Sequence, residues 1–210
     1  MIFDVTLPIY EDMIVWPGDP EISVERKEED GFYVSKLCMG THSGTHIDPP
    51  KHIGKGFDGA DSIPLHRLLG PCRVADVSGH GIVTEQVLED AGIPSHTVRL
   101  LLKTDNSRWI GTEKEFREDF VGLSEDAARW LVSRGIEVVG IDGYSIEPYD
   151  GTGAVHHILL ENGVVIVENL VLRDVPEGSY ELLCLPLKLV EGDGAPVRVV
   201  LRSDAIDEGV

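Results

Sequence analysis

The sequence predicts a sheet-dominated α/β domain with few helices. Short apolar, β-branched segments recur along the chain, most of them bounded by Gly, Pro or Asp. The segments within GIEVVGID and GVVIVEN are continuous apolar runs, which are typical of strands covered on both faces. We therefore expect a closed or heavily covered sheet. The eight predicted strands are residues 22–25, 33–39, 73–77, 98–103, 136–141, 164–167, 180–187 and 197–201.

Three segments have the pattern of a helix. The clearest covers residues 124–134, where Ser124 suits the N-cap, acidic residues fill the first turn, apolar residues follow at helical spacing and Gly135 ends the helix. A second predicted helix covers residues 84–92, and a third covers residues 155–162. The helices are thus expected to cover a sheet that forms most of the domain.

Length and charge limit the classes of function. The 210 residues fit a single domain, residues 1–210. With 37 acidic and 18 basic residues, the net charge is −19, which disfavours binding to nucleic acids and to anionic membrane surfaces. The chain lacks a basic start with a long apolar run and any stretch of about 18 apolar residues. It is therefore predicted to be cytoplasmic.

The three cysteines, Cys38, Cys72 and Cys184, are scattered and form no CxxC pair. This spacing argues against a disulfide framework and against a thiolate zinc finger. We predict that all three are buried free thiols.

The segment HSGTHIDPPKH, residues 42–52, carries the strongest chemical signal. His42, His46, Asp48 and His52 all occupy even positions, so in an extended chain they would face the same side. Imidazoles with a carboxylate are ligands for Zn²⁺, Mn²⁺, Fe²⁺ or Co²⁺. The alternative is a polar loop with hydrogen-bonded histidines. The density of the cluster favours a metal site, and three protein ligands would leave a position for water.

A second, weaker cluster combines His156, His157 and Glu168. If His156 begins a helix and Glu168 ends a buried strand, both could point into one cavity at the edge of the sheet, and one of them could complete a second metal position. Alternatively, one histidine is exposed, the other is packed, and Glu168 caps a strand. The motifs HExxH, GxxxxGK[ST] and GxSxG do not occur, so water activated by a metal is the best supported nucleophile.

The motif HxGTHxDxPxH is complete in residues 42–52, and WPGD, GID, HH, IVENLVL and YELLCLPLKLVEGDGAPVRVVLR extend the pattern along the chain. With these motifs the sequence resembles the metal-dependent cyclase family that contains bacterial kynurenine formamidase. The resemblance implies a swivelling β/β/α-type domain with a partly open barrel. It also implies a homo-oligomer, dimer or tetramer, with two Zn²⁺ per subunit or Mn²⁺ in their place.

The resemblance further implies a role for each motif residue. His52 would be the general acid and base, and Trp16 would pack on the aromatic ring of the substrate, although an ordinary core tryptophan is an equal alternative. The remaining motif residues would bind metal: His42 and His46 the first ion, His156 the second, with Asp48 and Glu168 bridging both.

The implied activity is hydrolysis of a carbon–nitrogen bond other than a peptide bond. N-formyl-L-kynurenine would give L-kynurenine and formate, as in tryptophan catabolism. Gly143, Tyr144 and Ser145 depart from the Thr-Pro-Ser type of stretch in these enzymes, which leaves the substrate open. A cyclic amide, as for isatin hydrolase, or another small amide or ester is the first alternative. A non-catalytic metal-binding domain is the second.

Overall fold

The computed structural model describes residues 1–203, and its centre is a ring of strands. Within these residues the ring has the order β10-β4-β8-β7-β6-β5-β9, and it closes because β9 pairs with both β5 and β10. The predicted sheet-dominated barrel is thereby confirmed, and its ring is closed rather than partly open. The ring strands are β4 (His46–Asp48), β5 (Leu69–Asp76), β6 (Arg99–Lys103), β7 (Val138–Ile141), β8 (Val165–Glu168), β9 (Gly178–Pro186) and β10 (Ala195–Arg202). A further strand, β1 (Ile2–Asp4), pairs with the C-terminal end of β10, residues 200–202.

Strands β5 to β8 run parallel, and both faces of β7 and β8 are covered. Val138 and Val165 belong to an apolar cluster that also contains residues of β9 and β10. Their neighbours Val139 and Ile166 belong to a second cluster, shared with the helices. Because successive strand residues face opposite sides, this arrangement explains the continuous apolar runs in the sequence.

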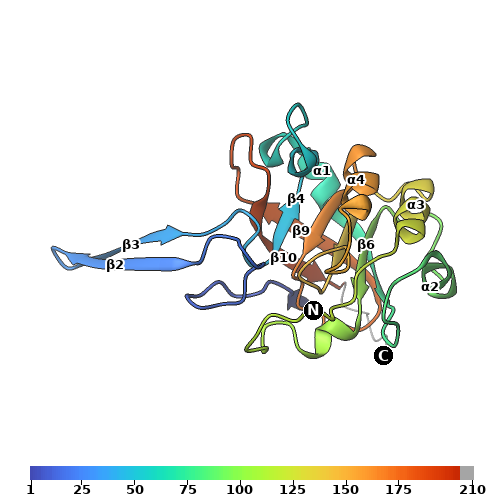
Figure 1. Ribbon diagram of the computed structural model, residues 1–210, viewed down its shortest axis with the longest axis horizontal. Helices are drawn as coiled ribbons and strands as arrows, with labels where there is room; N and C mark the ends of the chain where they lie inside the picture. The colour runs from blue at the N-terminus through green and yellow to red at the C-terminus, as the bar shows by residue number, and fades with distance from the viewer. Residues whose placement is uncertain (204–210) are drawn as a thin grey trace, which may run out of the picture.

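The three predicted helices are confirmed as α2 (Glu85–Asp90), α3 (Glu125–Ser133) and α4 (Ala154–Glu161). They lie together on one side of the barrel (Figure 1). The structure adds α1 (Leu65–Leu68) and the short 3₁₀ helices η1 (Pro50–Ile53), η2 (Ala60–Ser62) and η3 (Asp105–Arg108). Across residues 1–203, every helix is too short or too polar to span a membrane.

The most conspicuous feature outside the barrel is a long hairpin, β2 (Ser23–Glu29) and β3 (Phe32–Cys38), which projects far from the body (Figure 1). We call residues 23–38 the arm. Asp30 and Gly31 form its turn, both with positive φ (52° and 81°), as the tightest hairpin turns require. The predicted strands 22–25 and 33–39 are thus confirmed as a separate two-stranded sheet.

The arm also corrects the prediction for the cysteines. Cys72 and Cys184 are buried in the barrel, as predicted, and burial raises the pKa of each thiol to about 12. Cys38 is exposed instead, because β3 leaves the body of the protein and has no core to enter.

Candidate metal centre

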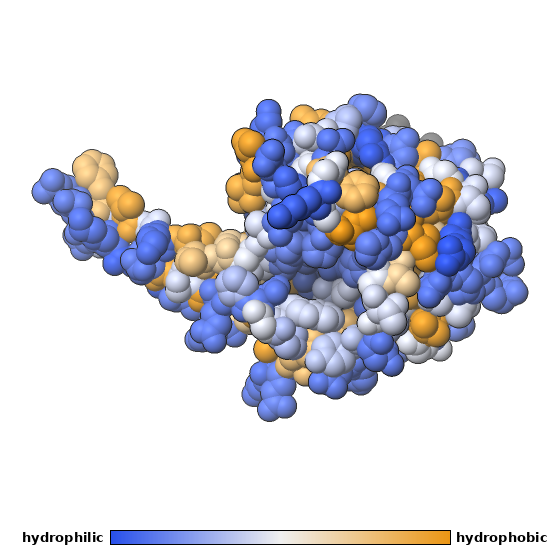
Figure 2. Space-filling model, turned by 45° about the horizontal axis from the view of Figure 1, so that its top comes forward, coloured by the Kyte–Doolittle hydropathy of each residue, from blue (hydrophilic) through white to orange (hydrophobic). Residues whose placement is uncertain are grey.

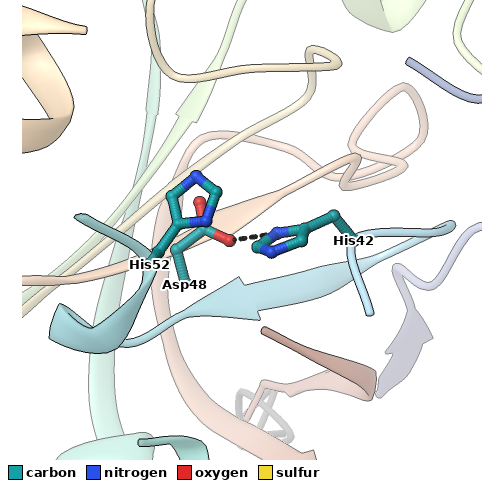
Figure 3. Close-up of side chains that lie close together, drawn as sticks. All are labelled: His42, Asp48 and His52. Atoms are coloured by element: carbon teal, nitrogen blue, oxygen red, sulfur yellow. Dashed lines mark ion pairs between the residues drawn. The ribbon is translucent and has the colours of Figure 1, made fainter. Parts of the chain in front are cut away.

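The segment 42–52 forms one wall of a cavity, and β4 is its fixed part. His46 and Asp48 are two residues apart in this strand and face the same side. His42 precedes the strand in a turn, and His52 follows it in η1. Figure 3 shows His42 and His52 converging on Asp48 from opposite ends of the segment. The four side chains thus converge as predicted, and bends in the segment bring them together.

The second predicted cluster reaches the same cavity. Glu168 ends β8 and is the register partner of His46 across the β4–β8 pair. His156 lies in the first turn of α4, and its Nε2 is 3.4 Å from Oε1 of Glu168. His157 points outward and pairs with Glu161 on the exposed face of the helix. Of the two adjacent histidines, His156 therefore lies in the cavity and His157 lies at the surface.

The two carboxylates occupy the centre of the cluster. Oδ1 of Asp48 lies 2.8 Å from Nδ1 of His42 and 3.5 Å from Nε2 of His46, while Oδ2 lies 4.0 Å from Nε2 of His156. Oε2 of Glu168 lies 3.3 Å from Nε2 of His46. Each carboxylate thus presents one oxygen to His46 and the other to His156.

Backbone and side-chain acceptors fix the orientation of two imidazoles. Nδ1 of His46 lies 2.9 Å from the carbonyl oxygen of Gly44, and Nδ1 of His156 lies 3.2 Å from Oε2 of Glu147. When each Nδ1 donates to these acceptors, each Nε2 faces the carboxylates with its lone pair. These two acceptors therefore favour the tautomer that a metal ligand needs, once the ring is neutral.

Glu147 is a site residue that the sequence did not reveal. Its carboxylate accepts hydrogen bonds from the backbone N–H groups of Gly153 (2.8 Å) and Val155 (3.1 Å), at the start of α4. A side chain at Gly151 would collide with this carboxylate. The contact from Glu147 to His156 spans a loop of irregular conformation, so no periodic spacing indicates it.

His42 is held by the loop that leads into β10. Its Nε2 lies 3.7 Å from Oδ2 of Asp193, whose other oxygen accepts a hydrogen bond from the hydroxyl of Thr41 (3.1 Å). The next residue, Gly194, packs directly on the imidazole, and a Cβ there would lie 2.6 Å from a ring atom. This position requires glycine because the ring occupies the space of a side chain.

The cluster has the buried, unpaired atoms expected of a metal site. Within residues 1–203, both oxygens of Asp48 and Nε2 of His46 are buried without a hydrogen bond. The short contact between Asp48 and His42 does not have the angle of a hydrogen bond. Leaving a buried polar group unpaired costs about 1–3 kcal/mol, and a cation would compensate these oxygens. The donor set of imidazoles and carboxylates fits divalent zinc or manganese.

The pKa values of the clustered side chains also favour a bound cation. Burial disfavours a charged imidazole, but the charge of Asp48 outweighs it and raises the pKa of His46 to about 9. For His156, burial is likewise outweighed, by hydrogen bonds to Glu147 and Glu168, and its pKa is raised to about 10. Burial also opposes ionisation of Asp48, yet the nearby histidine charges hold its pKa below the usual range. The cluster therefore concentrates negative charge that either protons or metal cations can balance.

His52 differs from the other histidines of the cluster. Its ring centroid lies 4.3 Å from that of His42 and 5.6 Å from that of His156. Burial of the ring is the main cause that lowers the pKa of His52. With Asp48 and His42 it also forms a group that could share one ion, so geometry alone permits two roles for this ring.

The cavity measures about 330 Å³, and an aromatic cluster forms one of its walls. Trp16 lines it and packs edge-on against Phe116, with ring centroids 5.5 Å apart. Tyr144 lines it too, stacks on Phe116 at 4.7 Å, and donates a hydrogen bond to Glu113 (2.9 Å). Trp16 is thus both a wall of the cavity and a partly buried member of an aromatic cluster.

Known proteins share this architecture. Residues 3–148 match the Cyclase family model. Kynurenine formamidase of Salinibacter ruber is 37% identical over 214 aligned positions, which cover 98% of this chain and 99% of the relative. A solved structure described as a potential metal-dependent hydrolase with cyclase activity is 39% identical, with a TM-score of 0.85 over 97% of this chain and 99% of the other. Isatin hydrolase A from Labrenzia aggregata, bound to benzyl benzoate, shares the fold at 21% identity, with a TM-score of 0.81 over 97% and 94% of the two chains. The chain therefore belongs to the cyclase family.

Proposed function

We propose that this protein hydrolyses N-formyl-L-kynurenine to L-kynurenine and formate. The observation that carries the proposal is the buried pair Asp48 and Glu168, which faces three imidazoles at one wall of a cavity and has aromatic side chains at another. The kynurenine formamidase relatives, which match nearly the whole chain, support an amide hydrolase acting on a non-peptide carbon–nitrogen bond.

The proposed metal ligands divide into two groups around the carboxylates. His42 and His46 would hold one ion, His156 would hold the second, and Asp48 and Glu168 would bridge them. Two Zn²⁺ per subunit are the first choice, with Mn²⁺ as the alternative. When bound, such a pair lowers the pKa of a water molecule and polarises the carbonyl group of the substrate.

His52 is the proposed general acid and base. It takes a proton from the attacking water while the new C–O bond forms at the formyl carbon. As the C–N bond breaks, the same imidazole returns the proton to the arylamine nitrogen, and formate leaves. Unlike His46, which is fully buried, His52 is an exposed residue that can exchange protons with solvent.

The walls of the cavity favour an aromatic amide that has an ammonium group. We assign Trp16 to the face of the substrate ring, since it lines the cavity beside the metal ligands. Asp19 also lines the cavity, and within residues 1–203 its side chain has no hydrogen bond or ion pair, while no Lys or Arg is among the lining residues. An ammonium group, as in the amino-acid part of formyl-kynurenine, fits this carboxylate, whereas isatin has no such group.

We propose a cytoplasmic homo-oligomer, dimer or tetramer, that acts in tryptophan catabolism. The sequence features and the similarity to formamidases support these points.

The experiment is metal reconstitution with parallel substrates. The purified protein is stripped with a chelator, reloaded separately with Zn²⁺ or Mn²⁺, and assayed with N-formyl-L-kynurenine and with isatin. We expect metal-dependent release of the arylamine with kcat/KM above about 10⁴ M⁻¹s⁻¹. Turnover of isatin alone would show that the substrate is a cyclic amide and not N-formyl-L-kynurenine. Tight metal binding without turnover of any amide would identify a non-catalytic metal-binding domain.

A further inference from the structure

Tyr144 lies shortly after the carboxyl end of β7, and the backbone before it is clamped. The carbonyl oxygen of Gly143 accepts a hydrogen bond from the N–H of Asn169 (2.9 Å). A Cβ at Gly143 would lie 2.7 Å from the amide nitrogen of Asn106, so this position requires glycine. Asn106 is itself fixed, because its side chain exchanges two hydrogen bonds (both 2.9 Å) with the backbone of Val121. The backbone that leads into Tyr144 therefore has little freedom to move.

The side chain of Tyr144 is held as firmly, and only 7% of the residue is exposed. Its ring stacks on Phe116, with centroids 4.7 Å apart and planes inclined by 16°. Phe120 packs edge-on against it at 5.7 Å, and the ring of Trp109 lies at 5.2 Å. The hydroxyl donates a hydrogen bond to Glu113 (2.9 Å). This side chain is therefore a rigid wall of the cavity.

The hydroxyl of Tyr144 is not free to donate to a substrate. A phenol has one O–H to donate, and Glu113 accepts it. Burial and this hydrogen bond raise the pKa of the phenol above its usual range, so the group stays neutral. Tyr144 therefore acts on a bound molecule through the shape of its ring.

Trp16 and Tyr144 form two walls of different orientation. Both side chains line the cavity, and both pack against Phe116. The plane of Trp16 is inclined by 85° to that of Phe116, whereas the ring of Tyr144 is nearly parallel to it. The two walls are therefore steeply inclined to each other. An aryl ring stacked on Trp16 consequently turns an edge toward Tyr144, which limits how far that ring can extend.

The cavity is small, and it is where an aryl group gains burial. Its volume of about 330 Å³ is at the lower end of the range of about 300–1,000 Å³ for ligand sites. The outer face of the barrel in Figure 2 is largely hydrophilic, with scattered hydrophobic residues. The apolar part of a substrate is therefore stabilised inside the cavity, and the walls set its size.

We propose that Tyr144 is the specificity-determining residue of this site and restricts the substrate to formamides of a single six-membered aryl ring. A second fused ring would have to occupy the space of the Tyr144 side chain. This role rests on the proposed function, because a formamide is the substrate of that reaction. It limits the size of the aryl group, whereas the carboxylate of Asp19 is assigned to the ammonium group.

The experiment compares two formamides that differ only in the aryl group. Formanilide has one ring, and N-(2-naphthyl)formamide has two fused rings. The value of kcat/KM is measured for both with the Zn²⁺-loaded protein, and their ratio is divided by the ratio of their rates of alkaline hydrolysis. This correction removes the difference in intrinsic reactivity. We expect the wild type to favour formanilide about tenfold or more.

Three variants test whether Tyr144 causes this preference. Tyr144→Ala removes more atoms than a second ring adds and should reduce the preference about tenfold or more. Tyr144→Phe keeps the ring and should keep the preference, because only the hydroxyl is lost. Tyr149→Ala is the matched control, since Tyr149 packs on Trp16 (5.5 Å) and Phe116 (5.6 Å) but is not among the residues that line the cavity. An unchanged preference in Tyr144→Ala, or an equal loss in Tyr149→Ala, would overturn the proposal.

A binding measurement makes the test independent of turnover and of misfolding. The dissociation constants of aniline and 2-naphthylamine are measured by ligand-detected NMR for the Zn²⁺-loaded wild type, Tyr144→Ala and the milder truncation Tyr144→Leu. Circular dichroism confirms the fold of each variant. The ratio of the naphthylamine constant to the aniline constant should fall about tenfold in a folded truncated variant, and an unchanged ratio would contradict the role of Tyr144.

Failure of the proposed function has a different signature. A metal-loaded wild type that hydrolyses neither formamide would refute the formamidase activity, while the binding ratio still tests the wall. A wild type that hydrolyses both formamides equally well, after the correction, would refute the size limit alone.

Discussion

Asp48 and Glu168, on neighbouring antiparallel strands, each direct one oxygen toward His46 and the other toward His156. The pairing of β4 with β8 sets this relationship, because His46 and Glu168 are direct register partners. Two carboxylates shared between two groups of imidazoles are the arrangement that the proposed pair of metal ions would need.

Replacing Asp48 by Asn removes a negative charge from the centre of the cluster and should lower metal occupancy. The loss should be directly visible as the metal-to-protein ratio after dialysis, measured by elemental analysis. Asp4→Asn is the control, because Asp4 is exposed, pairs with Arg198 and is not among the residues that line the cavity. Full metal content in Asp48→Asn would contradict the bridging role.

His52→Ala should keep the metal and lower kcat about 10²- to 10⁴-fold, because it removes the proposed proton carrier while leaving the ligands in place. Metal content and kcat are measured on the same sample, with His96→Ala, an exposed surface variant, as the control. Loss of metal with unchanged activity per bound ion would make His52 a ligand instead, as its grouping with His42 and Asp48 permits.

Glu147→Gln should weaken metal binding about 10- to 100-fold, because the acceptor that orients His156 becomes weaker. The readout is the metal dissociation constant from competition with a chromogenic chelator. Glu161→Gln is a matched control, since Glu161 makes the same kind of contact with His157 on the exposed face of the same helix. Equal affinities for the two variants would show that the contact of Glu147 does not position the ligand.

Asp19→Asn should raise KM for N-formyl-L-kynurenine and leave KM for uncharged formanilide unchanged. The reason is that only the first substrate has an ammonium group for this carboxylate. Steady-state kinetics with both substrates separate this effect from a general loss of activity. A parallel rise in both KM values would show that Asp19 shapes the cavity and does not recognise charge.

Metal binding should release protons at pH 7. In the metal-free chain the pKa values of His46 and His156 are raised to about 9 and about 10, so both rings hold a proton that a metal must displace. Metal affinity should therefore increase as pH rises from 7 toward 9, and proton release should decline as pH passes through both pKa values. Calorimetry in buffers of different ionisation enthalpy measures the released protons. Metal binding without proton release at pH 7 would contradict the raised values.

Local patterns in the sequence were sufficient to predict many of the strands and helices of the fold. Continuous apolar runs predicted β7 and β8, and capping signals predicted α3, because burial and helix ends depend on neighbouring residues. The even spacing of His46 and Asp48 predicted their common face for the same reason. The short β4 itself was not predicted, since three residues carry no periodicity.

Only the tertiary structure shows the contacts between segments that are distant in the sequence. Glu147 reaches His156 through an irregular loop, Gly194 leaves space for the ring of His42, and β3 carries Cys38 away from the core. None of these relationships has a repeat or spacing along the chain. The sequence by itself determined which side chains can bind metal and which segments form strands, because those properties are local. Their distances and orientations depend on strand register and loop closure, which only the folded chain sets.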